Sequence, residues 1–119
     1  MKKLLLFLSF ASLYASDEMG SLLFHGNCTT CHFELKEISA PAMITVRERY
    51  IKAFPKKGDF VKYLSEWVAR PNAQTSIMQD AIKKHGIMPH LGYEKEVIKE
   101  IAAYIYDTDF TKQHKNHIR

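Results

Sequence analysis

The residues of this 119-residue chain whose types and spacing indicate the most specific chemistry are two cysteines and a histidine. Cys28 and Cys31 are separated by two residues, and His32 follows directly. Thiols at this spacing lie about one turn apart, so each can add to a vinyl group on one edge of a porphyrin, while the adjacent imidazole is carried to the metal. The pattern therefore predicts covalent attachment of one haem c through both cysteines, with His32 as an axial ligand of the iron.

A cysteine pair with this spacing has three other possible uses. It could form a structural disulfide, a redox dithiol of the thioredoxin kind, or half of a zinc site. A thioredoxin-like domain needs strands, and no alternating strand pattern occurs in the sequence. A zinc site would need a second cysteine pair, and His25 is a poor fourth ligand. Haem attachment is the interpretation that agrees best with an exported protein.

The first 15 residues are predicted to be a secretory signal peptide. A basic start at residues 2–3 precedes a mainly apolar run of ten residues, Leu4 to Leu13. Such a run is shorter than the roughly 20 residues that span a bilayer. Cleavage after Ala15 would release residues 16–119 as one soluble domain in a bacterial periplasm; retention of the segment as a membrane anchor is the alternative.

The composition restricts the function classes. The hydrophobic fraction of 46% is ordinary for a globular chain. The formal charge of +4 falls to +2 once the two N-terminal lysines are removed, and haem propionates would bring the protein near neutrality. No nucleic-acid surface is therefore expected. The sequence also lacks a glycine-rich phosphate loop and internal repeats.

The spacing of apolar residues predicts an all-α fold. Asp59 is expected to cap the third helix and Pro71 to stop it, and the polar tail from residue 108 is expected to fray. The helices are expected at residues 17–27, 43–54, 59–69, 76–85 and 93–106, with loops at 33–42 and 87–92.

Over residues 20–107 the chain resembles the class I cytochrome c family. In that family the helix before the haem motif carries a glycine eight residues ahead of the first cysteine and an aromatic residue four ahead, positions held here by Gly20 and Phe24. An aromatic residue on the C-terminal helix, matched by Tyr104, packs against them. The resemblance implies the class I cytochrome c fold for residues 16–119, with the N- and C-terminal helices crossing around a single haem.

The same resemblance implies that Met88, which precedes a proline, is the second axial ligand of the iron. Met43 and Met78 are rival thioethers, and His85 or His90 would instead give bis-histidine ligation. A methionine ligand closes the sixth position and raises the reduction potential, which suits electron transfer and disfavours catalysis.

Two further residues match family positions. Pro41 resembles the proline whose carbonyl accepts the Nδ1–H of the axial histidine, a bond that fixes the orientation of the ring. Trp67 resembles the tryptophan whose indole N–H reaches a haem propionate; the alternative is plain core packing.

The resemblance implies a monomeric single-electron carrier, not an enzyme, in a respiratory chain. Its partners would be a quinol-oxidising cytochrome complex and a terminal oxidase or peroxidase. A tightly bound redox subunit and a haem-based sensor remain as alternatives. Four lysines are candidates for steering acidic partners, or are ordinary solvated charges: Lys36, Lys83, Lys84 and Lys95.

Overall fold

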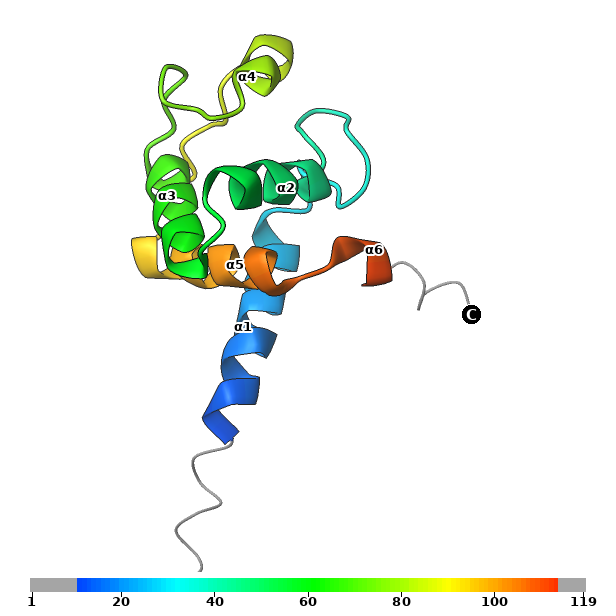
Figure 1. The fold of residues 1–119 in the computed structure, drawn as a ribbon, viewed down its shortest axis with the longest axis vertical. Helices are drawn as coiled ribbons and strands as arrows, with labels where there is room; N and C mark the ends of the chain where they lie inside the picture. The colour runs from blue at the N-terminus through cyan, green and yellow to red at the C-terminus, as the bar shows by residue number, and fades with distance from the viewer. Residues whose placement is uncertain (1–10, 114–119) are drawn as a thin grey trace, which may run out of the picture.

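The computed structural model describes residues 11–113 and is built from helices alone, with no strand in that part of the chain. This confirms the all-α class. Residues 1–10, which hold most of the predicted signal peptide, lie outside the described residues. The helices, shown in Figure 1, are α1 (Ala11–Asn27), α2 (Met43–Ala53), α3 (Lys57–Ala69), α4 (Gln79–His85), α5 (Lys95–Asp107) and α6 (Phe110–Gln113).

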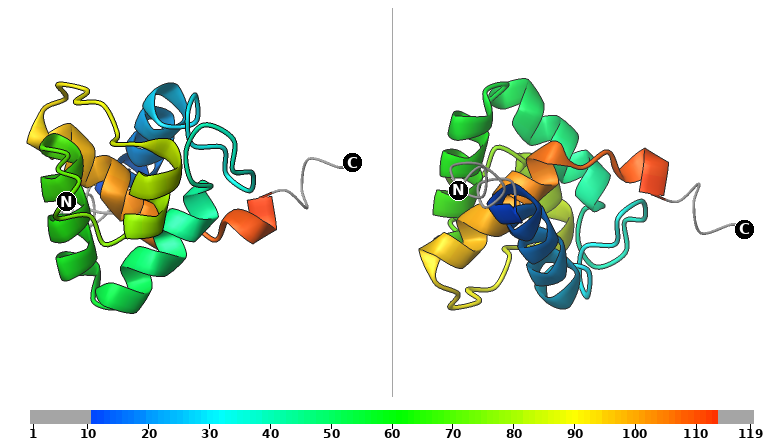
Figure 2. Two further views of the ribbon diagram at one scale, coloured as in Figure 1. Left: turned by 90° about the horizontal axis from the view of Figure 1, so that it is seen from above. Right: turned by 90° about the horizontal axis from the view of Figure 1, so that it is seen from below.

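Helices α1 and α5 cross in close contact, as both views of Figure 2 show. Gly20 makes the close approach possible. A Cβ atom added there would lie 2.9 Å from the Cβ of Tyr104 and 3.2 Å from the backbone oxygen of Glu100. Four residues further along α1, the ring of Phe24 packs on Tyr104, with the ring centroids 5.3 Å apart. The predicted contact between the N-terminal and C-terminal helices is therefore confirmed.

Helix α5 is the centre of the core. Its apolar residues recur every three or four positions, so they form one face, which packs against α1 and α3. Arg47 of α2 donates hydrogen bonds to the carbonyls of Ile105 (2.9 Å) and Tyr106 (2.9 Å) at the end of α5. A cation at that position also complements the helix dipole. The buried apolar side chains contributed by α3 and α5 are Phe60, Leu64, Ile98, Ile101, Ala102 and Ile105.

The expectation of a frayed tail is wrong for residues 108–113. Thr108 is buried, and its hydroxyl donates a hydrogen bond to the carbonyl of Tyr104. Phe110 begins α6 and is only 1% exposed, because its ring packs against Phe24 at a centroid distance of 5.5 Å. One apolar residue in a polar tail is therefore enough to anchor it.

Four predicted helix starts also need correction. Helix α1 begins at Ala11 and α5 at Lys95, not at residues 17 and 93. Helix α3 begins at Lys57, two residues earlier than expected, so Asp59 lies within its first turn and does not cap it. Helix α4 begins at Gln79 and not at Ser76. The Ser76 hydroxyl accepts the Met78 N–H at 3.0 Å, which satisfies that donor in a local turn ahead of the helix.

The close crossing predicts that a methyl group added at Gly20 destabilises the fold, whereas one added elsewhere in α1 does not. Gly20→Ala should lower the free energy of unfolding by about 1–3 kcal/mol, because the Cβ of Tyr104 sits close to the backbone and cannot move aside. Gly26→Ala in the same helix is the control. Nothing lies within 4 Å of a Cβ there, so it should be neutral or stabilising by up to about 1 kcal/mol. Denaturant titration measures both; equal effects would refute the close crossing.

Candidate cofactor site

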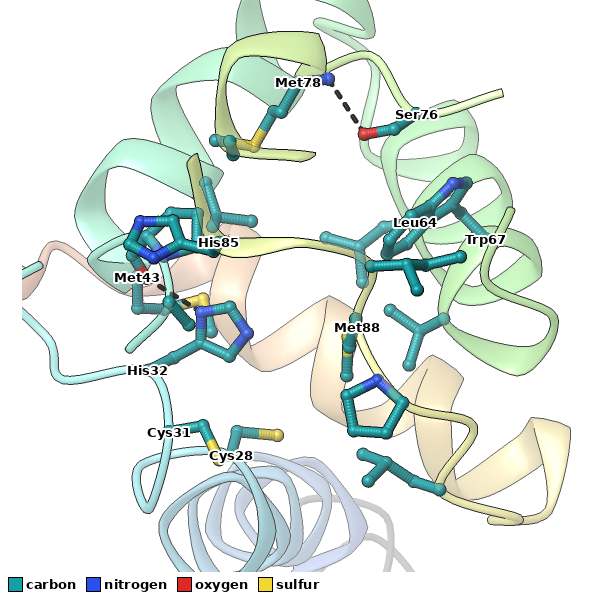
Figure 3. Close-up of a pocket in the computed structure, with 18 of the residues that line it drawn as sticks. Cys28, Cys31, His32, Met43, Leu64, Trp67, Ser76, Met78, His85 and Met88 are labelled. Carbon is teal, nitrogen blue, oxygen red and sulfur yellow. Dashed lines mark hydrogen bonds between the residues drawn. The ribbon is translucent and has the colours of Figure 1, made fainter. Parts of the chain in front are cut away.

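A mostly apolar cavity of about 310 Å³ lies between α2, α3, α5 and the segment that contains α4 (Figure 3). Cofactor sites commonly have volumes of roughly 300–1,000 Å³ and apolar walls with a few placed polar groups. Many of its polar or sulfur-containing side chains come from the end of α1, the loop 28–42 and the segment 76–91. The cavity therefore joins the parts of the chain that hold the candidate residues predicted from the sequence.

The cysteine cluster lies directly after α1 and continues its helical turn. The Cys28 N–H donates to the Phe24 carbonyl and the His32 N–H donates to the Cys28 carbonyl, each at 2.9 Å. Cys28, Cys31 and His32 all line the cavity. Both thiols are free; Cys31 is exposed, whereas burial raises the pKa of Cys28 to about 11.

The imidazole of His32 is oriented by the loop that follows it. Its Nδ1 donates a hydrogen bond to the Pro41 carbonyl at 2.8 Å, the contact that the resemblance implied. This bond leaves Nε2 as the nitrogen able to bind a metal. Burial lowers the pKa of His32, the Pro41 bond opposes that shift, and nearby His85 adds to it. A neutral imidazole is the form that ligates.

Met88 lies across the cavity from His32 (Figure 3). Gly86, at φ 81°, closes α4 and turns the chain into the extended segment that carries Met88. An imidazole and a thioether therefore face each other, with the two cysteines at one edge between them.

The rival ligands are placed differently. Met43 is buried next to His32, and Met78 lies at the end of the cavity furthest from the cysteines (Figure 3). His85 lines the cavity on the same side as His32, and its Nε2 donates to Glu37 at 2.7 Å. His90 is exposed and does not line the cavity. Of these side chains, none is opposite His32 as Met88 is.

Trp67 lines the cavity, but its indole N–H donates to the backbone carbonyl of Asn72 at 3.0 Å. A propionate would therefore have to compete with a hydrogen bond already made. The structure supports Trp67 as part of the cavity wall more directly than as a propionate donor.

The four candidate lysines are all exposed but come from three segments. Lys36 lies in the loop 28–42, Lys83 and Lys84 lie on α4, and Lys95 begins α5. The ammonium group of Lys84 is 3.2 Å from the Glu37 carboxylate, so part of its charge is already compensated.

Sequence reasoning missed the contribution of α2. Met43, Val46 and Tyr50 line the cavity and are spaced three and four residues apart, as one helical face requires. This spacing is visible in the sequence, but it indicates only that these residues share a face and not that the face lines a cavity. Tyr50 is 6% exposed, and burial raises the pKa of its phenol to about 12.

No protein-family model matches the chain, and no solved structure matches it. Among curated proteins it is similar to an uncharacterized protein of Aquifex aeolicus (strain VF5), with 28% identity over 129 aligned residues, which cover 87% of this chain and 85% of the relative. The similarity runs along most of both chains.

Burial of Tyr50 predicts a pH dependence at the alkaline end. Its folded pKa of about 12 lies above the ordinary value of about 10, so the folded state holds this proton more tightly. That stabilisation is complete below about pH 10 and is lost as the pH rises through about 12. The free energy of unfolding should therefore fall over this range by about 1–2 kcal/mol more in the unmodified protein than in Tyr50→Phe. Tyr63→Phe, at an exposed position, should leave the profile unchanged; parallel curves for all three proteins would contradict the assignment.

Proposed function

We propose that this chain is a monohaem c-type cytochrome that carries single electrons outside the cytoplasm. The observation that carries the proposal is the opposition of His32 and Met88 across an apolar cavity with Cys28 and Cys31 at its edge. A class I cytochrome c fold is part of the proposal, supported by the crossing of α1 and α5 at Gly20.

The residues fit a covalently held haem. Cys28 and Cys31 would hold it through thioether bonds, while His32 and Met88 would bind the metal from opposite sides. Bound haem would supply an iron that accepts and releases one electron at a time. The Pro41 carbonyl keeps the imidazole of His32 in one orientation.

The cavity wall adds two properties that suit a carrier. Apolar side chains from α2, α3 and α5 exclude water from the centre, and the dense packing of those helices resists rearrangement when the charge changes. If His32 and Met88 both bound the iron, no position would be left for a substrate, which would favour electron transfer over catalysis.

The proposed setting is the periplasm, with transfer from a quinol-oxidising cytochrome complex to a terminal oxidase or peroxidase. A second candidate is a redox subunit that stays bound to a larger complex. Exposed apolar side chains in the loop beside the cysteine cluster favour it: Phe33, Leu35 and Ile38 are 41%, 43% and 64% exposed. Gel filtration of a gently prepared periplasmic extract distinguishes the two, because a carrier elutes at its own mass.

The covalent link is tested directly on exported protein. The full chain, produced in a bacterium that attaches haem c, should be recovered from the periplasm with the added mass of one haem and no thiol open to alkylation. Cys28→Ser together with Cys31→Ser should lose the haem on acid extraction, because no thioether remains. An exported chain with two reactive thiols and no haem would refute the proposed function.

The axial ligand is tested by its spectrum. Met88→Ala should abolish the weak near-infrared methionine–iron band of the oxidised protein and lower its reduction potential, while the haem stays attached. Met78→Leu removes another thioether from the same cavity and should keep the band. A band that survives in Met88→Ala, or that disappears in Met78→Leu, would show that Met88 is not the ligand.

A further inference from the structure

Helix α4 covers one side of the cavity without burying any of its own residues. Ala81 and Ile82 line the cavity from half-buried positions. In Figure 1 the helix lies at the edge of the molecule, joined to α3 and α5 by non-helical segments. Segments with little buried apolar surface open easily unless other contacts hold them, so the contacts of α4 decide how firmly it is held.

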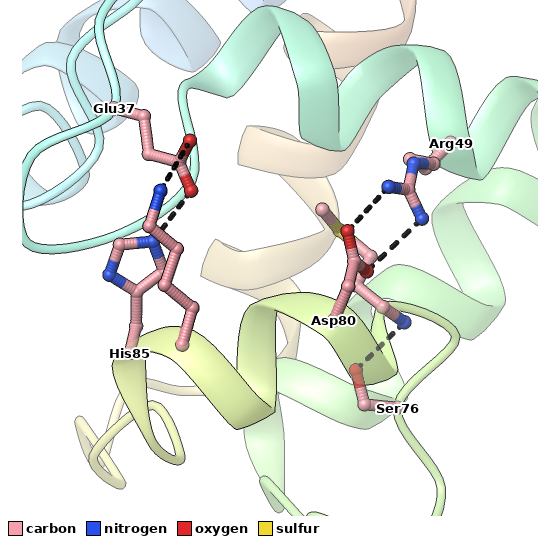
Figure 4. Close-up of polar contacts among 7 residues, drawn as sticks. Glu37, Arg49, Ser76, Asp80 and His85 are labelled. Carbon is pink, nitrogen blue, oxygen red and sulfur yellow. Dashed lines mark hydrogen bonds and ion pairs between the residues drawn. The ribbon is translucent and has the colours of Figure 1, made fainter.

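The first contact joins the start of α4 to α2. Arg49 donates two hydrogen bonds to the carboxylate of Asp80, at 2.6 and 3.2 Å (Figure 4). Two parallel hydrogen bonds between a guanidinium and a carboxylate fix the relative orientation of the two groups as well as their separation. Hydrogen bonding to Arg49 lowers the pKa of Asp80, so this carboxylate is ionised at neutral pH.

The second contact joins the end of α4 to the loop after the cysteine cluster. The Glu37 carboxylate accepts a hydrogen bond from His85 Nε2 at 2.7 Å, and its other oxygen is 3.2 Å from the ammonium group of Lys84 (Figure 4). The His85 bond, followed by that from Lys84, lowers the pKa of Glu37. Both ends of a seven-residue helix are therefore held by charged groups on other elements.

The position of Met88 depends on where α4 ends. Met88 follows His85 by three residues, a length of chain that spans at most about 10 Å. Within the described part of the chain, none of the hydrogen bonds involves residues 87–93. In this part of the chain, the position of Met88 therefore depends on packing at the cavity and on the helix that ends three residues before it.

We propose that these two charged contacts, Arg49 with Asp80 and Glu37 with His85 and Lys84, are positioning groups that hold α4 over the cavity and thereby fix Met88 opposite His32. We call them the two clamps. The inference rests on the proposed function in taking Met88 as the iron ligand. It adds that residues on α2 and on the loop 28–42, which do not touch the metal, control how firmly that ligand is held.

The test removes both clamps without changing α4 itself. Arg49→Met and Glu37→Ala lie outside the helix, so its own sequence and helix propensity stay intact. In the oxidised holoprotein of this double variant, added imidazole should displace Met88 more readily. Its dissociation constant should fall by about threefold to tenfold, the range expected for the loss of exposed ion pairs. Each single variant should give a smaller effect in the same direction.

Ionic strength provides a second measurement on the same proteins. Raising it from about 0.01 to 1 M shortens the screening length from roughly 30 to 3 Å. The imidazole dissociation constant of the unmodified protein should then fall toward that of the double variant, whereas the double variant should change little.

Lys57→Met is the matched control. It breaks an ion pair with Asp107 that is equally short, at 2.6 Å, and similarly exposed, but joins α3 to α5 away from α4. Imidazole binding should stay at the unmodified value. A double variant that binds imidazole no more tightly than the unmodified protein, or a control that shifts as far as the double variant, would overturn the proposal.

Failure of the proposed function has a different signature. An unmodified holoprotein without the methionine–iron band would refute Met88 as the ligand. The two clamps are then tested by hydrogen exchange at the amides of Ile82 and Gly86. These amides donate hydrogen bonds to the carbonyls of Met78 and Ile82, at the two ends of α4. Faster exchange there in the double variant, with α5 unchanged, supports the clamps, and unchanged exchange overturns them.

Discussion

The close crossing of α1 and α5 at Gly20 is the constraint on which the rest of the structure depends. Two helix backbones come into contact there because no side chain separates them. Phe24 then packs on Tyr104 and on Phe110, so the end of α1 is fixed against the most buried helix and the tail. The chain leaves that fixed end directly into the turn of Cys28. The position of the candidate attachment site is therefore a consequence of how two helices pack.

The same crossing explains why one wall of the cavity is part of the buried core, whereas the opposite wall has few buried residues. Helix α5 gives its apolar face to α1, α3 and the cavity together, so this wall belongs to the main core. The loop 28–42, α4 and the segment 86–94 complete the cavity with few buried residues of their own. A group held between them, as proposed, would add apolar contacts to the elements that have least. Binding to the folded chain would then stabilise the cavity as well as fill it.

Local patterns predicted most of the helices because their apolar residues recur at helical spacing. Met43–Ala53 was found in this way, and Pro71 ends α3 in the expected place. The burial of Phe110 was not predicted, because a single apolar residue has no period and depends on where Phe24 lies. The pairing of Glu37 with His85 joins positions 48 residues apart. One sequence holds no sign of such a contact between a loop residue and the end of a distant helix.

The two candidate axial ligands are held by different physical means. His32 lies next to two cysteines in the chain, and its ring is bonded to a backbone carbonyl, which neither salt nor nearby charges alter much. Met88 follows a short helix whose contacts with other elements include the exposed ion pairs of Asp80 with Arg49 and of Lys84 with Glu37, and such pairs weaken as ions screen them. A thioether is also the weaker of the two kinds of donor to iron. In the proposed centre, the side with the weaker bond would thus be the side whose support responds to the ionic surroundings, and the imidazole would keep the group in place when that support loosens.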